Sequence, residues 1–180
     1  MEIFLIRHTS VDVPLGVCYG QSDVPLRDTF EQEAAVTAGN LKSYLQQDRD
    51  FGHVYTSPLS RCTRLASYCG YPDAERDKRL MEINFGDWEM KRFEQIDDPR
   101  LQEWYADYIN VATTGGESFA MQYQRVANFL DELKEKEYES VAIFAHGGVL
   151  ICAQLYAGSI KQEEAFGALT PYGGIIRLEL

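Results

Sequence analysis

Residues 1–10 read MEIFLIRHTS, an apolar run that ends abruptly in an arginine, a histidine and two hydroxyl side chains. A short apolar run bounded by polar residues is typical of a buried strand, here over Glu2–Ile6. The two residues that follow this strand, Arg7 and His8, both favour anions. A buried strand that ends in such a pair suggests an anion site at that end of the sheet.

The rest of the chain alternates between predicted strands and predicted helices. Further strands are predicted over His53–Thr56, over Ser140–Ala145 and in the closing GGIIRLEL of residues 173–180. Helical spacing of apolar residues predicts helices over Arg27–Gln47, from an N-cap at Ser57 to Cys69, after Gly115–Gly116 and over Val149–Ala157, with short helical stretches near Phe93 and over Leu101–Ile109. This alternation predicts an α/β three-layer sandwich with a mainly parallel central sheet flanked by helices. We expect one domain over residues 1–180.

Composition excludes several classes of function. No apolar stretch approaches the roughly 20 residues that span a bilayer, so we expect no membrane partner. The N-terminal apolar run lacks the basic flank and the length of a signal peptide, which makes the cytoplasm the expected location. The net charge is −11, and such a surface repels nucleic acid. Any site for a small anion must therefore be local and strongly basic.

Cysteine and histidine usage does not favour a metal site. The chain has four cysteines, none of them in a C-x-x-C pair, and three histidines. Structural zinc sites need closely spaced ligands of these types, so we expect no metal. We expect the cysteines to be reduced, because the sequence has no secretion signal.

Three predicted strand ends carry residues suited to one site. Arg7 and His8 end the first strand, Arg61 lies just after the second, and His146 ends the third. Each feature alone has an ordinary structural explanation, such as a solvated loop or a tight turn. Together they place two of the three histidines and two arginines where parallel sheets bind ligands, at the carboxyl ends of their strands.

This set of residues suits a phosphate group. Arginine presents a rigid fork of donors that matches phosphate oxygens, and a helix N-terminus after Ser57 would add backbone N–H groups. A neutral histidine can attack phosphorus directly. The departing oxygen then needs a proton donor, and a partly desolvated carboxyl group near the phosphoryl charge could supply it.

Four motifs in order resemble the histidine phosphatase superfamily of phosphoglycerate-mutase-like proteins: LIRH at 5–8, SPLSRCTRLA at 57–66, LMEINFGDWE at 80–89 and AHGG at 145–148. The resemblance covers nearly the whole chain. It implies that His8 is the histidine that becomes phosphorylated, and that Arg7, Arg61 and His146 hold the phosphate. It also implies that Glu82 protonates the leaving group and later activates water, with no cofactor.

The chain departs from the family pattern at several positions. Thr9 stands where the family has a glycine, Ser10 where it has an acid, and Pro14 where an asparagine contacts phosphate. Met90 replaces a frequent glycine. The GGES at 115–118 resembles the segment that enters a late helix, for which we expect a structural role.

The stretch GVCYGQSDVPL at 16–26 resembles the α-ribazole phosphatase branch, which removes the 5′-phosphate of α-ribazole during assembly of the cobalamin lower loop. The expected substrate-binding residues are Gln21, Ser10, Gly147 and Trp88. Residues 88–115 form either a lid that stacks on a planar base or a small accessory core. The alternatives are a phosphatase of other small esters, a phosphoglycerate mutase and a catalytically silent phosphoryl-binding scaffold. The oligomeric state stays open, with a homodimer as one candidate.

Overall fold

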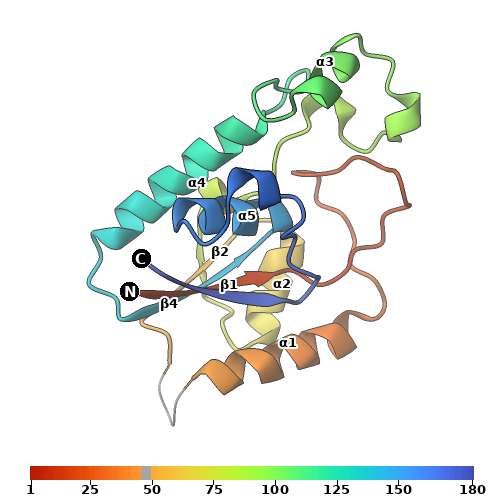
Figure 1. Ribbon diagram of the computed structural model, residues 1–180. Coiled ribbons are helices and arrows are strands. Elements are labelled where there is room, and N and C mark those ends of the chain that lie inside the picture. The colour runs from red at the N-terminus through yellow and green to blue at the C-terminus, as the bar shows by residue number, and fades with distance from the viewer. Residues whose placement is uncertain (46–49) are drawn as a thin grey trace.

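A central sheet separates two layers of helices in the computed structural model, which describes residues 1–45 and 50–180 (Figure 1). The strands lie in the order β3-β2-β4-β1-β5. They are β1 (Glu2–Arg7), β2 (His53–Thr56), β3 (Glu75–Arg76), β4 (Ser140–Ala145) and β5 (Ile175–Glu179). All neighbouring strands pair in parallel except β5, which runs antiparallel to β1. The predicted α/β sandwich with a mainly parallel sheet is confirmed.

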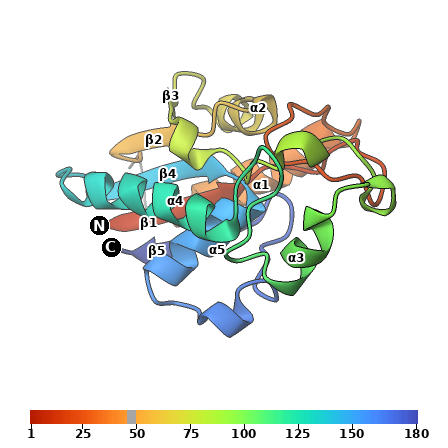
Figure 2. The same ribbon diagram turned by 90° about the horizontal axis from the view of Figure 1, so that it is seen from above.

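Alternation along the strands builds the two cores. Ile3 and Leu5 of β1 face one side and pack with α4 (Phe119–Lys134) and α5 (Gly147–Tyr156). Phe4 and Ile6 face the other side, toward α1 (Phe30–Tyr44) and α2 (Ser60–Tyr68). Successive strand residues point to opposite faces, so a continuous apolar run fits a sheet covered on both sides. Figure 2 shows α4 and α5 on one face of the sheet and α1 and α2 on the other.

Two helix starts differ from the prediction. The first helix begins at Phe30 rather than Arg27 and ends at Tyr44, and the predicted end at Gln47 lies outside the described residues. The second begins at Ser60 with Leu59 as its N-cap, instead of at Pro58 after an N-cap at Ser57. The Ser57 N–H donates to the carbonyl of Phe144 at 2.8 Å, so residue 57 still continues the strand ladder.

The helix predicted over Val149–Ala157 begins two residues earlier, because the two glycines after His146 are helical. They form the first turn of α5, which begins at Gly147. The predicted helix after Gly115–Gly116 is α4, and the short helical stretches are a 3-10 turn at Phe93–Gln95 and α3 (Arg100–Ala106). The edge strand β3 was not predicted, because two residues carry no readable pattern.

A third apolar cluster lies outside the sandwich. Its buried members are Cys18, Trp88, Ile96 and Leu101, with Phe85, Phe93 and Trp104 packed against them. Figure 1 places this region, with α3, at the end of the molecule beyond α4. In the described part of the chain, no helix is both long and apolar enough to cross a membrane.

Candidate active site

The sheet brings the three strand ends together. β4 pairs with both β1 and β2, so Arg7 lies beside Ala145, and Thr56 beside Phe144. The ladder continues one step further, because the His8 N–H donates to the Ala145 carbonyl at 3.1 Å. His8, Ser57 and His146 consequently leave adjacent strands at one edge, as predicted for a ligand site in a parallel sheet.

His8 is held as a neutral ring with one nitrogen directed by the backbone. Its Nδ1 lies 2.7 Å from the carbonyl oxygen of Thr9, which can only accept, so Nδ1 carries the proton. The lone pair of the neutral ring is therefore on Nε2. Burial lowers the pKa of His8 from 6.5 to about 3, and the positive charges of Arg61 and Arg7 act in the same direction. The residue is 3% exposed.

Arg61 and Arg7 bring two permanent positive charges to His8. Arg61 is fully buried and donates to the carbonyls of Ser22 at 2.9 Å and Gly20 at 2.5 Å. Arg7 donates to the Thr170 carbonyl at 2.6 Å. These contacts leave N–H groups of both guanidinium forks for a ligand, because each fork has five donors.

His146 is fully buried behind Arg61. Arg61 Nε donates to His146 Nδ1 at 3.2 Å, and His146 Nε2 lies 2.8 Å from Ser57 Oγ. With Nδ1 accepting, Nε2 carries the proton and donates to the serine. Burial lowers the pKa of His146 well below 6.5, with Arg61 as the next cause. Both ring nitrogens thus have protein partners, and the His146 ring lies edge-on to that of His8, with centroids 5.2 Å apart.

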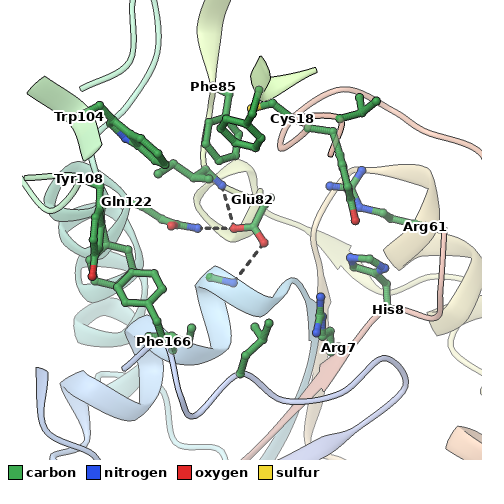
Figure 3. A pocket seen from close by; sticks show the side chains of 18 residues that line it. Arg7, His8, Cys18, Arg61, Glu82, Phe85, Trp104, Tyr108, Gln122 and Phe166 are labelled. Carbon is green, nitrogen blue, oxygen red and sulfur yellow. Dashed lines mark hydrogen bonds between the residues drawn. The ribbon is translucent and has the colours of Figure 1, made fainter. Parts of the chain in front are cut away.

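Glu82 reaches the same end of the pocket from the loop that follows the 3-10 turn Lys78–Leu80. Its Oε1 accepts from the N–H of Ile83 at 2.9 Å and from Gln122 Nε2 at 2.8 Å. Its Oε2 accepts from the N–H of Gly148 at 3.1 Å, at the N-terminus of α5. Figure 3 shows the carboxyl group of Glu82 and the ring of His8 facing each other across the pocket.

The pocket that holds these groups has a volume of about 580 Å³ and two unlike ends. Arg7, His8, Arg61 and Glu82 line one end (Figure 3). The other end is aromatic and aliphatic. Its lining includes Phe85, Phe93, Trp104, Tyr108, Phe119 and Phe166. Such a pocket suits a phosphate ester whose organic part is flat and largely apolar.

The four expected substrate-binding residues lie outside this lining. Gln21 donates through Nε2 to the Glu82 carbonyl at 3.0 Å, and the N–H and hydroxyl of Ser10 both donate to Glu33. Gly147 lies beneath Arg7, where an added Cβ atom would come 3.3 Å from Arg7 Nε. Trp88 is 1% exposed and donates to Asp98 at 2.8 Å. Trp88 belongs to the third cluster, and Trp104, which packs edge-on against it, lines the pocket instead.

The departures from the family pattern have clear local settings. Glu33 of α1 supplies a carboxylate beside Ser10, where the family has its own acid. Burial opposes ionisation of Glu33, but the hydrogen bonds from Ser10 and Thr29 outweigh it and lower the pKa. Thr9 is fully buried, and its hydroxyl has no hydrogen-bond partner among the described residues. Met90 has φ = 62°, the left-handed conformation that explains the family's glycine there.

The N-terminus of α2 is occupied by a carboxylate rather than left for phosphate. Asp23 accepts from the N–H of Ser60 at 2.9 Å and from its hydroxyl at 2.7 Å. The anion expected at this helix end is therefore supplied by the protein itself. The prediction failed here because the helix begins three residues after Ser57.

Sequence reasoning missed several residues that shape the site. Glu89 accepts from the N–H groups of Gly20, Gln21 and Ser22, the loop whose carbonyls hold Arg61. The Ser22 hydroxyl also donates to Glu89. Burial opposes ionisation of Glu89, but these hydrogen bonds, with the one from the Ser22 hydroxyl as the largest influence, lower its pKa. It stands in the quoted motif LMEINFGDWE, so its position in a recognised motif was a usable signal.

Two tyrosines lie at the end of the pocket that Arg7 and Arg61 line. The hydroxyl groups of Tyr19 and Tyr172 lie 3.0 Å apart, joining two segments that are far apart in the chain. Tyr172 stacks on Arg7, whose guanidinium carbon lies 4.0 Å from the ring centroid. No sequence pattern links these two residues.

No metal-binding group was found among residues 1–45 and 50–180. No three His, Cys, Asp or Glu side chains come together there in a way that could hold an ion. The four cysteines are free thiols.

Comparisons with known proteins agree with this geometry. The family model of the histidine phosphatase superfamily (branch 1) matches residues 3–180. An adenosylcobalamin/alpha-ribazole phosphatase of Escherichia coli is 29% identical over 158 residues, which cover 83% of this chain and 75% of that protein. A protein of Yersinia enterocolitica named probable phosphoglycerate mutase GpmB is 30% identical over 162 residues, covering 84% and 72%.

The solved structures include a similar fold. The crystal structure of the alpha-ribazole phosphatase from Shigella flexneri superposes with a TM-score of 0.86 and 26% identity, covering 100% of this chain and 91% of that one. The match of the family model over nearly the whole length decides the assignment. The chain belongs to the histidine phosphatase superfamily.

Proposed function

We propose that this protein is a phosphomonoesterase that acts through a phosphohistidine intermediate, and that its substrate is α-ribazole 5′-phosphate. The observation that carries the proposal is the state of His8. A buried neutral ring, with Nδ1–H fixed on the Thr9 carbonyl, directs an Nε2 lone pair beside two arginines. This is the arrangement that a nitrogen nucleophile needs for attack on phosphorus.

In the first step, His8 Nε2 attacks the phosphorus atom and forms an N–P bond as the ester P–O bond breaks. Arg7 and Arg61 stabilise the charge on the phosphoryl oxygens. Protonated Glu82 gives its proton to the departing oxygen, so that a neutral alcohol leaves. The Glu82 carboxylate that results is stabilised by three N–H donors, from Ile83, Gln122 and Gly148.

In the second step, water replaces the alcohol. The Glu82 carboxylate takes a proton from the water as its oxygen attacks phosphorus, and the N–P bond breaks. His8 recovers its lone pair, Glu82 recovers its proton and inorganic phosphate leaves. His146 acts through Arg61 in both steps, because it accepts from Arg61 Nε and is anchored by Ser57.

The substrate assignment is supported by the aromatic end of the pocket and by two relatives. α-Ribazole carries a planar dimethylbenzimidazole base, which suits the rings of Trp104 and Tyr108. The E. coli and S. flexneri proteins are both named for this activity. A mutase would have to retain the phosphohistidine long enough to return the phosphate to a second hydroxyl.

The test compares phosphate release from α-ribazole 5′-phosphate, 3-phosphoglycerate and an aryl phosphate. We expect the highest kcat/KM for α-ribazole 5′-phosphate and at least about a 1000-fold loss for His8→Ala with every substrate. We also expect a denatured, quenched enzyme to carry acid-labile phosphate on His8. Activity should persist in a strong chelator.

Each rival has its own outcome. Faster release from either of the other two substrates would overturn the choice of substrate. Transfer of phosphate between phosphoglycerates without net release would indicate a mutase. Full turnover by His8→Ala would overturn the mechanism, and the absence of turnover with any phosphate ester would indicate a silent scaffold.

A further inference from the structure

We propose that Arg125 is a positioning residue for Glu82, and that Glu117 orients Arg125 for this task. The inference rests on the proposed role of Glu82 as proton donor and adds a residue that does not touch the substrate. Both residues lie outside the pocket lining, and Arg125 belongs to α4.

The guanidinium group of Arg125 holds the backbone of the segment that carries Glu82. Its Nη1 donates to the carbonyls of Arg79 at 2.7 Å and Met81 at 2.6 Å. Its Nη2 donates to the carbonyl of Glu82 itself at 2.9 Å. Carbonyls before and at residue 82 are thus fixed by one rigid plane, which limits rotation of the backbone at Glu82.

Glu117 fixes the plane of that guanidinium. Its Oε1 accepts from Arg125 Nε at 2.8 Å and its Oε2 from Nη2 at 3.0 Å, a bidentate pair. Glu117 Oε2 also accepts from the N–H of Asn84 at 2.9 Å, two residues beyond Glu82. The side chains of the pair are 17% and 16% exposed, so water competes little for these bonds.

Arg125 makes five hydrogen bonds with its five N–H donors, so none remains for a ligand. It therefore cannot hydrogen-bond the substrate, and we assign its effect to the geometry of Glu82. Its charge also acts on His146, and a variant that keeps the charge leaves that effect in place. Gln122, three residues earlier on the same face of α4, donates to the carboxyl group. Helix α4 therefore fixes both the side chain of Glu82, through Gln122, and its backbone, through Arg125.

The test uses the dependence of rate on the leaving group. Arg125→Lys keeps the charge but loses the planar fork, so the carboxyl group of Glu82 should lose its alignment with the departing oxygen. We expect about a 30-fold loss of kcat/KM, which reports on the steps up to release of the alcohol, for α-ribazole 5′-phosphate, whose alkoxide needs a proton. We expect at most about a threefold loss of kcat/KM for p-nitrophenyl phosphate, whose leaving group departs without a proton.

The matched control is Arg79→Lys. Arg79 lies in the same segment, and its guanidinium contacts Asp77 and Glu132 instead of the backbone at Glu82. We expect Arg79→Lys to change kcat/KM by no more than about twofold for either substrate. Equal losses of kcat/KM for Arg125→Lys on both substrates would overturn the inference, because a general loss of structure does not depend on the leaving group.

A double variant separates this inference from the proposed function. If Arg125 acts through Glu82, Arg125→Lys should cause no further loss in a Glu82→Gln background. A further independent loss would overturn the inference. If Glu82→Gln itself loses kcat/KM equally on both substrates, the role of Glu82 as proton donor fails instead. Should Arg125→Lys not fold, Glu117→Gln takes its place, with the same expected dependence on the leaving group and the same contrary result.

Discussion

At the scale of single residues, the absence of a side chain at Gly148 brings helix α5 against Glu82. The N–H of Gly148 donates to Glu82 Oε2 at 3.1 Å. A Cβ atom on Gly148 would overlap Glu82 Oε1 and lie 2.8 Å from Gln122 Nε2. The glycine thus lets the positive end of a helix contact a carboxylate directly.

Gly148→Ala should displace Glu82 and lower kcat for α-ribazole 5′-phosphate by about 100-fold, a typical effect of misplacing a catalytic proton donor. The matched control is Gly39→Ala, also within a helix, where no atom lies within 4 Å of the added Cβ. Both changes raise helix propensity, so the control should retain full activity and gain about 0.5–1 kcal/mol of stability. Steady-state kinetics and urea denaturation measure the two effects. Normal activity of Gly148→Ala would contradict this contact.

At the scale of elements, the segment from Phe85 to Tyr108 serves two purposes. It has its own small core around Trp88, and Trp104 joins that core to the pocket by packing against both Trp88 and Phe93. The sequence left two interpretations open, a lid that stacks on a planar base and a small accessory core. The structure has the small core around Trp88, and stacking of a base on Trp104 stays a prediction. Trp104 packs against this core and also lines the pocket.

Trp104→Leu should remove stacking against the base of the substrate. We expect kcat/KM for α-ribazole 5′-phosphate to fall by about tenfold, the value of a lost aromatic contact, with less than about a threefold change for a small aliphatic phosphate. Tyr105→Leu is the control, because Tyr105 contacts Trp104 but is 52% exposed and outside the pocket lining. Equal losses on both substrates would indicate a general disturbance of the segment rather than a binding surface.

The sequence predicted those parts of the site that follow from strand ends and recognised motifs. Arg7, His8 and Arg61 could be brought together from the sequence, because parallel strands end at one edge. Glu82 could be added only through the resemblance to the superfamily. The exact helix start near Ser57 could not, because a competing strand bond to Phe144 decides it. Arg125 was also out of reach, since its partners are backbone carbonyls of a segment more than 40 residues away.

At the scale of the whole molecule, an acidic surface surrounds a small basic centre. The net charge is −11, whereas two arginines and two histidines converge at one end of the sheet. Burial and the arginine charges keep both His8 and His146 neutral, since a further positive charge there would be repelled. Two buried, neutral histidines of this kind make the stability of the fold depend on pH.

The stability of the protein should fall as the pH drops from 7.5 to 5.5. An unfolded histidine has a pKa near 6.5, whereas the pKa of His8 is about 3 and that of His146 is well below 6.5, so the unfolded state binds more protons in this range. With a folded-state pKa of about 3, His8 removes about 1.4 kcal/mol from the free energy of unfolding over this range, and His146 lowers it further. Above the unfolded-state pKa near 6.5, unfolded histidines are mostly neutral as well, and the loss disappears. The carboxylates whose pKa values are lowered titrate below the range from pH 7.5 to 5.5.

Urea denaturation at both pH values measures this loss, and His8→Asn should reduce it by about 1.4 kcal/mol by removing one of the two groups. A free energy of unfolding that stays constant between pH 7.5 and 5.5 would contradict the neutral, buried state of both rings. Saturating inorganic phosphate should also reduce the loss, because a bound anion offsets the arginine charges and raises the pKa of His8 in the folded state. The same pair of measurements thus connects the fold to the proposed chemistry, since a neutral ring that makes the protein less stable in acid is the ring to which we assign attack on phosphorus.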